Sequence, residues 1–163
     1  MTQRTERTYN IARSGKRVVA DFRRLLETGD VDRITPGLYY ALTMHAGFIA
    51  HFDIGGFQHY YRGRLAELLD GELHPLTNAW RWGDDDTGHS GTRRDLECSV
   101  YRDGWSAADV MRGICKVARE LEADVRWRQA QQRRSAELAV AQRIADEYGV
   151  TLTPTDARAE ASR

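Results

Sequence analysis

Three of the chain's 5 histidines lie in one short aromatic segment, and imidazole is the side chain most readily tuned for proton transfer or metal binding near neutral pH. They are His45, His51 and His59, with Asp53 among them. Helical metal sites usually present histidines three or four residues apart, whereas His45 and His51 are six apart and do not share one face of a regular helix. The trio of His51, Asp53 and His59 is therefore the better candidate for a metal-dependent catalytic site.

The competing interpretation makes His45 a core histidine and the other residues caps of a turn between helices. A buried imidazole usually finds a hydrogen-bond partner, and the spacing of this cluster matches no zinc motif. The sequence also contains no GxSxG, GxxxxGK[ST], GxGxxG or HExxH segment. The structural interpretation is favoured, a catalytic role is not supported, and no cofactor is implied.

Basic residues gather in two segments that could contact a protein partner or follow nucleic-acid phosphates. One segment lies near the N-terminus, and the other surrounds Trp127, whose ring could stack on a base. The candidate contact residues are Arg13, Lys16, Arg17, Arg24, Arg126, Trp127, Arg133 and Arg134. Solvated helical faces give the same pattern, and the formal net charge is +0, so nucleic acid is an alternative partner and not the leading one.

Apolar spacing predicts three helices in the first half of the chain. The first is expected over residues 8–27. The second begins after Thr35 as N-cap, with Pro36 at its first position, and continues as the central core helix to residue 52. Gly55 and Gly56 are expected to interrupt it, and the third helix follows over residues 57–69.

The second half of the chain predicts a hairpin and then a long helix. Residues 78–101 hold two short alternating runs that could pair as a small β-hairpin. Ser106 stands three residues before Asp109, as in a capping box, and starts a helix that ends before Gly149. Its apolar stripe turns polar over residues 126–134, which indicates either a solvated stalk or a break.

The fold class expected is mainly α, a helical bundle with a long C-terminal helix. At 163 residues the chain has the size of one domain, and we expect a helical core over 1–125, a projecting helix over 126–149 and a flexible tail over 150–163. A mean hydropathy of -0.62 and the absence of a long apolar run predict no membrane span. The first residues carry no secretory signal, which favours a cytoplasmic location.

The leading functional prediction is a non-catalytic helical interaction module that docks on another protein or a macromolecular complex. Tryptophan, tyrosine and arginine are the usual anchors of such interfaces. Self-association through the C-terminal helix would bury its stripe of Leu138, Ala141, Ile144 and Tyr148. Two alternatives remain, a nucleic-acid-binding accessory protein that uses the arginine-rich faces and a metal-dependent enzyme at the histidine and aspartate cluster.

Overall fold

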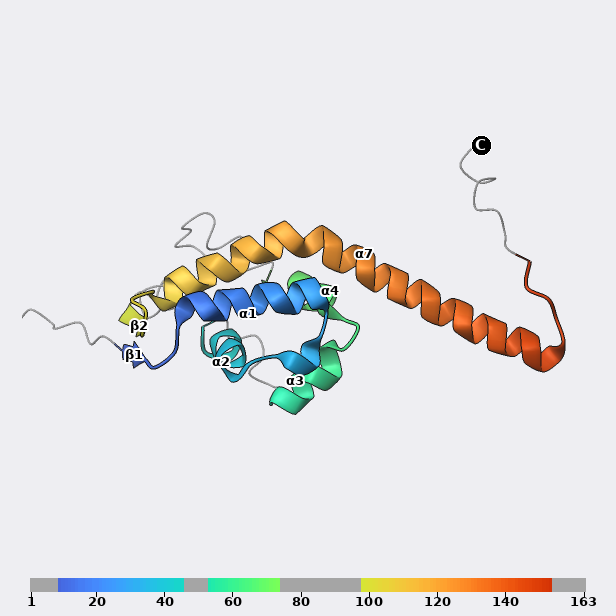
Figure 1. Ribbon diagram of the computed structural model, residues 1–163, viewed down its shortest axis with the longest axis horizontal. Coiled ribbons are helices and arrows are strands. Elements are labelled where there is room, and N and C mark those ends of the chain that lie inside the picture. The colour runs from blue at the N-terminus through green and yellow to red at the C-terminus, as the bar shows by residue number, and fades with distance from the viewer. Residues whose placement is uncertain (1–8, 46–52, 74–97, 154–163) are drawn as a thin grey trace, which may run out of the picture. The chain divides into compact units, whose positions relative to one another are not determined.

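The computed structural model describes residues 9–45, 53–73 and 98–153 of the chain, and most of them are helical (Figure 1). This confirms the mainly α fold and the long C-terminal helix. The chain divides into two compact units, Met1–Gln129 and Ala130–Arg163, and the division falls inside the last helix. The elements are β1 (Tyr9–Ile11), α1 (Gly15–Thr28), the 3-10 turn η1 (Val31–Arg33), α2 (Pro36–Met44), α3 (Ile54–Tyr61), α4 (Leu65–Glu67), the π-helical η2 (Leu68–Leu73), β2 (Ser99–Tyr101) and α7 (Ala107–Tyr148).

Two strand-turn-helix segments lie side by side in the first unit. Strands β1 and β2 pair in parallel, with Asn10 opposite Val100, and each leads through a short turn into a helix, α1 or α7. The expected helix start at residue 8 is therefore wrong, because Tyr9–Ile11 is a strand. The strand expected near Cys98 is present as β2 and pairs with β1. The run around Trp80 that was expected to pair with it lies outside the described residues.

The N-terminus of α1 is capped by a carboxylate from the turn between β2 and α7. Asp103 accepts hydrogen bonds from the backbone N–H groups of Gly15 and Lys16, both at 3.0 Å, and from the Ser14 hydroxyl at 2.8 Å. Ser14 itself accepts from the N–H of Arg17 at 3.2 Å. The first turn of a helix leaves its N–H groups without intrahelical partners, so these contacts satisfy three of them and place a negative charge at the positive end of the helix dipole.

Helices α1 and α7 approach closely and in parallel because small residues stand at their contact. A Cβ atom on Gly113 of α7 would lie 2.7 Å from a methyl group of Val19. A Cβ atom on Gly15 of α1 would lie 2.8 Å from a methyl group of Val110. Both distances are below normal van der Waals contact, so glycine is required at these two positions for the helices to pack at this distance.

The other helices complete one apolar core around α1 and the first half of α7. Thr35 caps α2 as expected, accepting from the N–H of Leu38 at 3.2 Å, and its hydroxyl also donates to Asp21 of α1 at 2.9 Å. The largest fully buried side chains are Tyr101, Phe22, Phe57, Leu26, Leu38, Leu42, Leu68, Met111, Ile114 and Val31. They come from α1, η1, α2, α3, η2, β2 and α7, so the core joins segments from both halves of the chain.

The glycine pair does not break a helix as expected. Gly55 and Gly56 lie in the first turn of α3, where the Asp53 side chain accepts from the N–H of Gly56 at 2.6 Å and caps the helix. The third helix therefore begins directly after Asp53, whose backbone is extended. A separate interruption, within the expected third helix, comes at Gly63, whose φ of 70° is in the left-handed region, and it separates α3 from α4. The core helix expected to reach residue 52 is described as far as Met44, and residues 46–52 lie outside the described part.

Helix α7 has the ends that the sequence predicts. The Ser106 hydroxyl accepts from the N–H of Asp109 at 3.0 Å while the Asp109 carboxylate accepts from the N–H of Ser106 at 2.9 Å, a reciprocal capping box. At the other end Gly149 has a φ of 64°, and the N–H of Val150 donates to the carbonyl of Ala145 at 2.8 Å. This is a Schellman motif. Between these ends the helix is continuous for 42 residues, so of the two alternatives for residues 126–134 the break does not occur.

We predict that Asp103→Ala lowers the free energy of unfolding by about 1–2 kcal/mol, since it removes the cap of α1. Desolvation raises the pKa of the Asp103 carboxyl group, but the hydrogen bonds from Lys16, Ser14, Gly15 and Trp105 outweigh it and hold this pKa well below its ordinary value of 3.8. The contribution is therefore present above pH 3.8 and is lost as the pH falls below it.

Urea unfolding of the wild type and Asp103→Ala as a function of pH measures this contribution. The difference between the two proteins should narrow steadily below about pH 4. Asp124→Ala is the control, because Asp124 is an exposed residue of α7, and it should change stability by less than about 0.5 kcal/mol. A difference between wild type and Asp103→Ala that does not depend on pH would show that the carboxylate charge is not what caps α1.

Candidate interaction surfaces

His45 is a buried core residue with one hydrogen-bond partner. Its Nε2 atom lies 2.8 Å from the hydroxyl oxygen of Tyr101, and its ring packs edge-on against Tyr40 and Tyr101. Burial lowers the pKa of His45 from 6.5 to about 4, because the charged imidazolium loses its hydration. The residue is therefore neutral near pH 7, as expected of a structural histidine.

The proposed metal trio is not brought together in the described part of the chain. Asp53 caps α3, and His59 is exposed in the last turn of the same helix, while His51 lies outside the described residues. Among residues 9–45, 53–73 and 98–153, no group of three histidine, cysteine, aspartate or glutamate side chains could hold a metal ion. Of the two free thiols, Cys115 is buried, and burial raises its pKa to about 11, which disfavours the nucleophilic thiolate.

We predict that His45 contributes a pH-dependent part of the stability. Its folded pKa of about 4 lies below the ordinary 6.5, so the unfolded chain binds more protons between these values. The free energy of unfolding should consequently fall by about 3 kcal/mol as the pH decreases through this range. Urea unfolding of wild type and His45→Gln measures how the free energy of unfolding depends on pH, and His45→Gln should lose most of this dependence. His59→Gln changes an exposed residue and is the control that should keep the pH dependence of wild type. NMR titration of the His45 ring to a pKa near 6.5 would contradict the prediction.

The basic residues predicted near the N-terminus are exposed, and two of them lie against aromatic rings. The guanidinium carbon of Arg13 is 4.9 Å from the centre of the Tyr40 ring, and the Lys16 ammonium is 6.0 Å from the Trp105 ring. Arg17 and Arg24 are exposed on α1. Arg13 and Lys16 thus lie over different rings.

A polar clamp formed by Arg126, Arg128 and Gln129 ties α7 to three other segments of the first unit. Arg126 donates to Asp70 of η2 at 3.0 Å and to Glu122 at 2.7 Å. Gln129 accepts from the N–H of Ala66 at 2.9 Å and donates to Glu67 at 3.0 Å. The polar residues that begin the 126–134 segment are thus structural contacts, and the guanidinium charge of Arg126 is matched within the chain.

Arg128 closes the C-terminal end of α1. Its guanidinium donates to the carbonyl of Glu27 at 2.7 Å and to the carbonyl of Leu26. These carbonyls belong to the last turn of α1, which has no intrahelical partners for them and carries the negative end of the helix dipole. The positive charge of Arg128 therefore stabilises the C-terminal end of α1.

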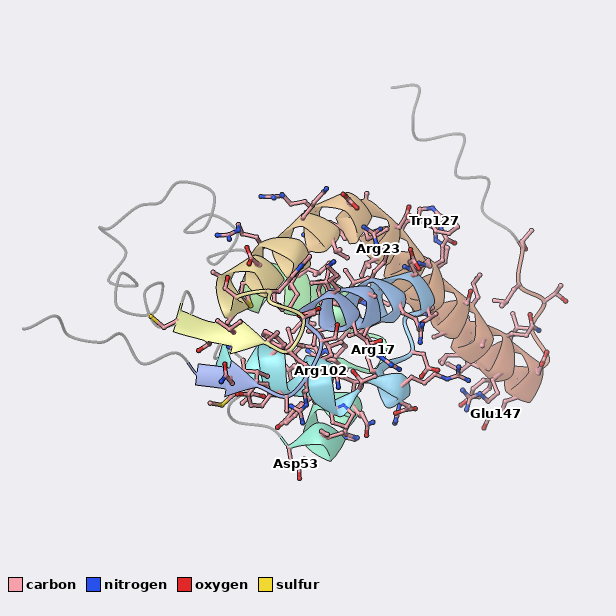
Figure 2. All side chains as sticks on the ribbon, turned by 60° about the vertical axis from the view of Figure 1, so that its left-hand side comes forward. Arg17, Arg23, Asp53, Arg102, Trp127 and Glu147 are labelled. Atoms are coloured by element: carbon pink, nitrogen blue, oxygen red, sulfur yellow. The ribbon has the colours of Figure 1, made fainter. Side chains whose placement is uncertain are left out.

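Trp127 lies between two members of the clamp and is exposed. Its side chain is 64% accessible to solvent and reaches outward from α7 (Figure 2). Because the neighbouring side chains are fixed by the clamp, the backbone of Trp127 is held in place although its ring is not packed. Exposed tryptophan on a rigid backbone is a typical anchor of a protein interface.

We predict that two neighbouring substitutions in this segment differ in their effect on the free energy of unfolding. Arg128→Ala should lower the free energy of unfolding by about 2 kcal/mol, because it removes charge-assisted hydrogen bonds to two carbonyl groups. Trp127→Ala should change it by less than about 0.5 kcal/mol, because the ring has little contact to lose. Urea unfolding of both variants measures the difference. Equal losses would mean that Trp127 supports the fold and is not available to a partner.

The second unit presents an exposed apolar face on the last turns of α7. Leu138 is 62% accessible, Ile144 52% and Tyr148 74%, and Val140 is exposed as well. At 100° per residue these four side chains fall within about half of the helix circumference, together with Ala141. The sequence had indicated Leu138, Ala141, Ile144 and Tyr148 but not Val140, which stands four residues before Ile144 and so shares its side of the helix.

The opposite side of these turns is polar. Gln142 and Arg143 are exposed there, and Gln142 donates to Asp146 at 2.7 Å. Ala139 also lies on this side, and it is exposed. The helical part of the second unit is therefore amphipathic, and its apolar side exposes Leu138, Val140, Ile144 and Tyr148, whereas Ala145 on the same side is buried.

Comparison of the chain with protein families, with curated proteins and with solved structures gives no match. In the part of the chain that the structure describes, no helix combines the length and apolar character needed to cross a membrane.

Proposed function

We propose that this protein is a non-catalytic helical interaction module that docks on another protein through the apolar face of the second unit. The observation that supports this proposal is the exposure of Leu138, Ile144 and Tyr148 on one side of α7. Clustered apolar side chains at the surface of a soluble protein mark interaction sites, since their burial removes water-exposed apolar area. The cytoplasmic location expected from the sequence is part of the same proposal.

The nucleic-acid alternative has less support, because several arginine side chains on α1 and α7 are paired with carboxylates of the chain. Arg23 of α1 pairs with Glu120 at 2.5 Å, and Arg126 pairs with Asp70 and Glu122. Guanidinium groups that are matched by carboxylates release fewer counterions on binding phosphates. The alternative of a metal-dependent enzyme has no ligand cluster in the described residues.

The test compares two aspartate substitutions on opposite sides of the same helical turns. Ile144→Asp places a charge in the apolar face, and Ala139→Asp places the same charge on the polar side. Tagged wild type and both variants are used to isolate binding proteins from native extract, at high salt and after nuclease treatment, with quantitative mass spectrometry.

A protein that docks on the apolar face should be retained by wild type and Ala139→Asp. Its recovery with Ile144→Asp should fall at least about tenfold, as for loss of a central interface residue. Circular dichroism of both variants controls for loss of helix. Equal recovery with all three proteins would overturn the proposed function, and loss of all bound material on nuclease treatment would favour the nucleic-acid alternative.

A further inference from the structure

Four basic residues gather in the first unit where the turn from β1 to α1 meets the turn from β2 to α7. Arg13 lies in the first of these turns, Lys16 and Arg17 begin α1, and Arg102 lies in the second turn. The backbone N–H of Arg102 donates to the carbonyl of Arg13 at 2.9 Å, which joins the two turns. All four residues are exposed (Figure 2). We call them the basic turn surface.

The basic turn surface is not neutralised by the described part of the chain. Residues 9–17 and 99–106 contain one carboxylate, Asp103, so four basic side chains leave this region with a formal charge of +3. Asp103 accepts its hydrogen bonds from the start of α1, where it caps the helix. Among the described residues, no ion pair joins a carboxylate to any of the four basic side chains, whereas Arg23 and Arg126 each have one.

Two of the four cations lie over aromatic rings of the first unit. The guanidinium of Arg13 lies over the ring of Tyr40, and the ammonium of Lys16 lies over the ring of Trp105. These contacts position the two cations but leave their charge in place, because an aromatic ring carries no net charge. The ring faces that the cations cover are not open to stack on a nucleic-acid base. The surface therefore offers positive charge and not a stacking platform.

We infer that the basic turn surface binds an acidic segment of a protein partner, through the aspartate and glutamate side chains of that segment. Opposite charges across an interface steer the two surfaces together and fix how they meet. The guanidinium groups of Arg17 and Arg102 present paired N–H donors in the geometry that a carboxylate accepts. This surface belongs to the first unit and shares no residue with the apolar face of the second unit. The inference therefore goes beyond the proposed function and does not depend on it.

A nucleic acid fits the same surface less well. Proteins that bind single strands combine phosphate contacts with open aromatic rings, and the ring faces at this surface are covered by the chain's own cations. Binding to duplex DNA commonly uses about 6–10 phosphate contacts, more than four cations provide. The formal net charge of +0 gives the whole chain no attraction toward a long polyanion. A short acidic peptide needs only the local charge.

Fluorescence anisotropy with labelled octaglutamate and the full chain tests the inference. Octaglutamate should bind with a Kd of about 100 μM or lower at about 50 mM salt, and a neutral glycine–serine octapeptide should not bind measurably. The double variant Arg17→Gln with Arg102→Gln should weaken octaglutamate binding about tenfold, because it removes two charged contacts. Arg119→Gln with Arg143→Gln removes the same net charge at exposed sites elsewhere, and it should bind octaglutamate within about twofold of wild type. Circular dichroism of both double variants controls for loss of helix.

NMR titration of the labelled full chain with octaglutamate locates the contact. The largest chemical-shift changes should fall on the backbone N–H groups of Gly15, Lys16 and Asp103, which lie within the two turns. Changes centred on any other surface of the chain would overturn the assignment of the acidic segment to the basic turn surface.

The chain's own run of Asp84, Asp85 and Asp86 has the same chemistry as the probe and lies outside the described residues. The triple variant Asp84→Asn, Asp85→Asn and Asp86→Asn is therefore measured beside wild type, and it should bind octaglutamate at least as tightly. Absence of binding by both proteins overturns the inference, as does an equal loss in the two arginine double variants. Tighter binding of labelled octathymidylate than of octaglutamate also overturns it and assigns the surface to nucleic acid.

The proposed function fails or stands by a different substitution. Ile144→Asp changes the second unit only, so it should bind octaglutamate like wild type even where it loses a captured protein. Arg17→Gln with Arg102→Gln should conversely keep any protein that docks on the apolar face alone. A loss of octaglutamate binding in Ile144→Asp would overturn the independence of the two surfaces.

Discussion

The cap that Asp103 places on the N-terminus of α1 is the contact that holds the two strand-turn-helix segments of the first unit together at their turns. It joins residues 88 positions apart, and it does so where β1 turns into α1 and β2 turns into α7. The parallel pairing of β1 with β2 and the parallel packing of α1 on α7 both continue from this point. Arg128 of α7 binds the last carbonyls of α1, so a carboxylate lies at the positive end of that helix and a guanidinium at its negative end. The two charges fix α1 along α7 at both ends, and glycines at 15 and 113 permit the close contact between them.

The elements that follow from local signals could be predicted from the sequence. Thr35 with Pro36, Ser106 with Asp109, and Gly149 each act within one helical turn, and each marks a helix end in the structure. Their effect depends on neighbouring residues only, which is why spacing was sufficient to find them.

The features that the sequence did not predict depend on contacts between residues far apart in the chain, or on segments whose residues allow either a helix or another local structure. Tyr9–Ile11 became a strand because β2 offers it a parallel partner, although its neighbours suggested a helix. Gly55 and Gly56 remained helical because Asp53 caps them. The sequence did not predict that Asp103 caps α1, because no spacing rule connects it with Gly15, which lies 88 residues away. In the candidate site, helical spacing was enough to find Leu138, Ile144 and Tyr148.

The two parts of α7 differ in what their side chains contact, and their composition accounts for the difference. Up to Gln129 its side chains are used within the first unit, by apolar burial and then by the polar clamp. Beyond that point it contains five alanines among nineteen residues, and alanine has the highest intrinsic helix propensity. Such a segment can begin as a continuation of a helix that is already formed, so it avoids the cost of nucleation. Its apolar face is therefore ordered before any partner arrives, and a partner that binds it loses little free energy to the ordering of the chain.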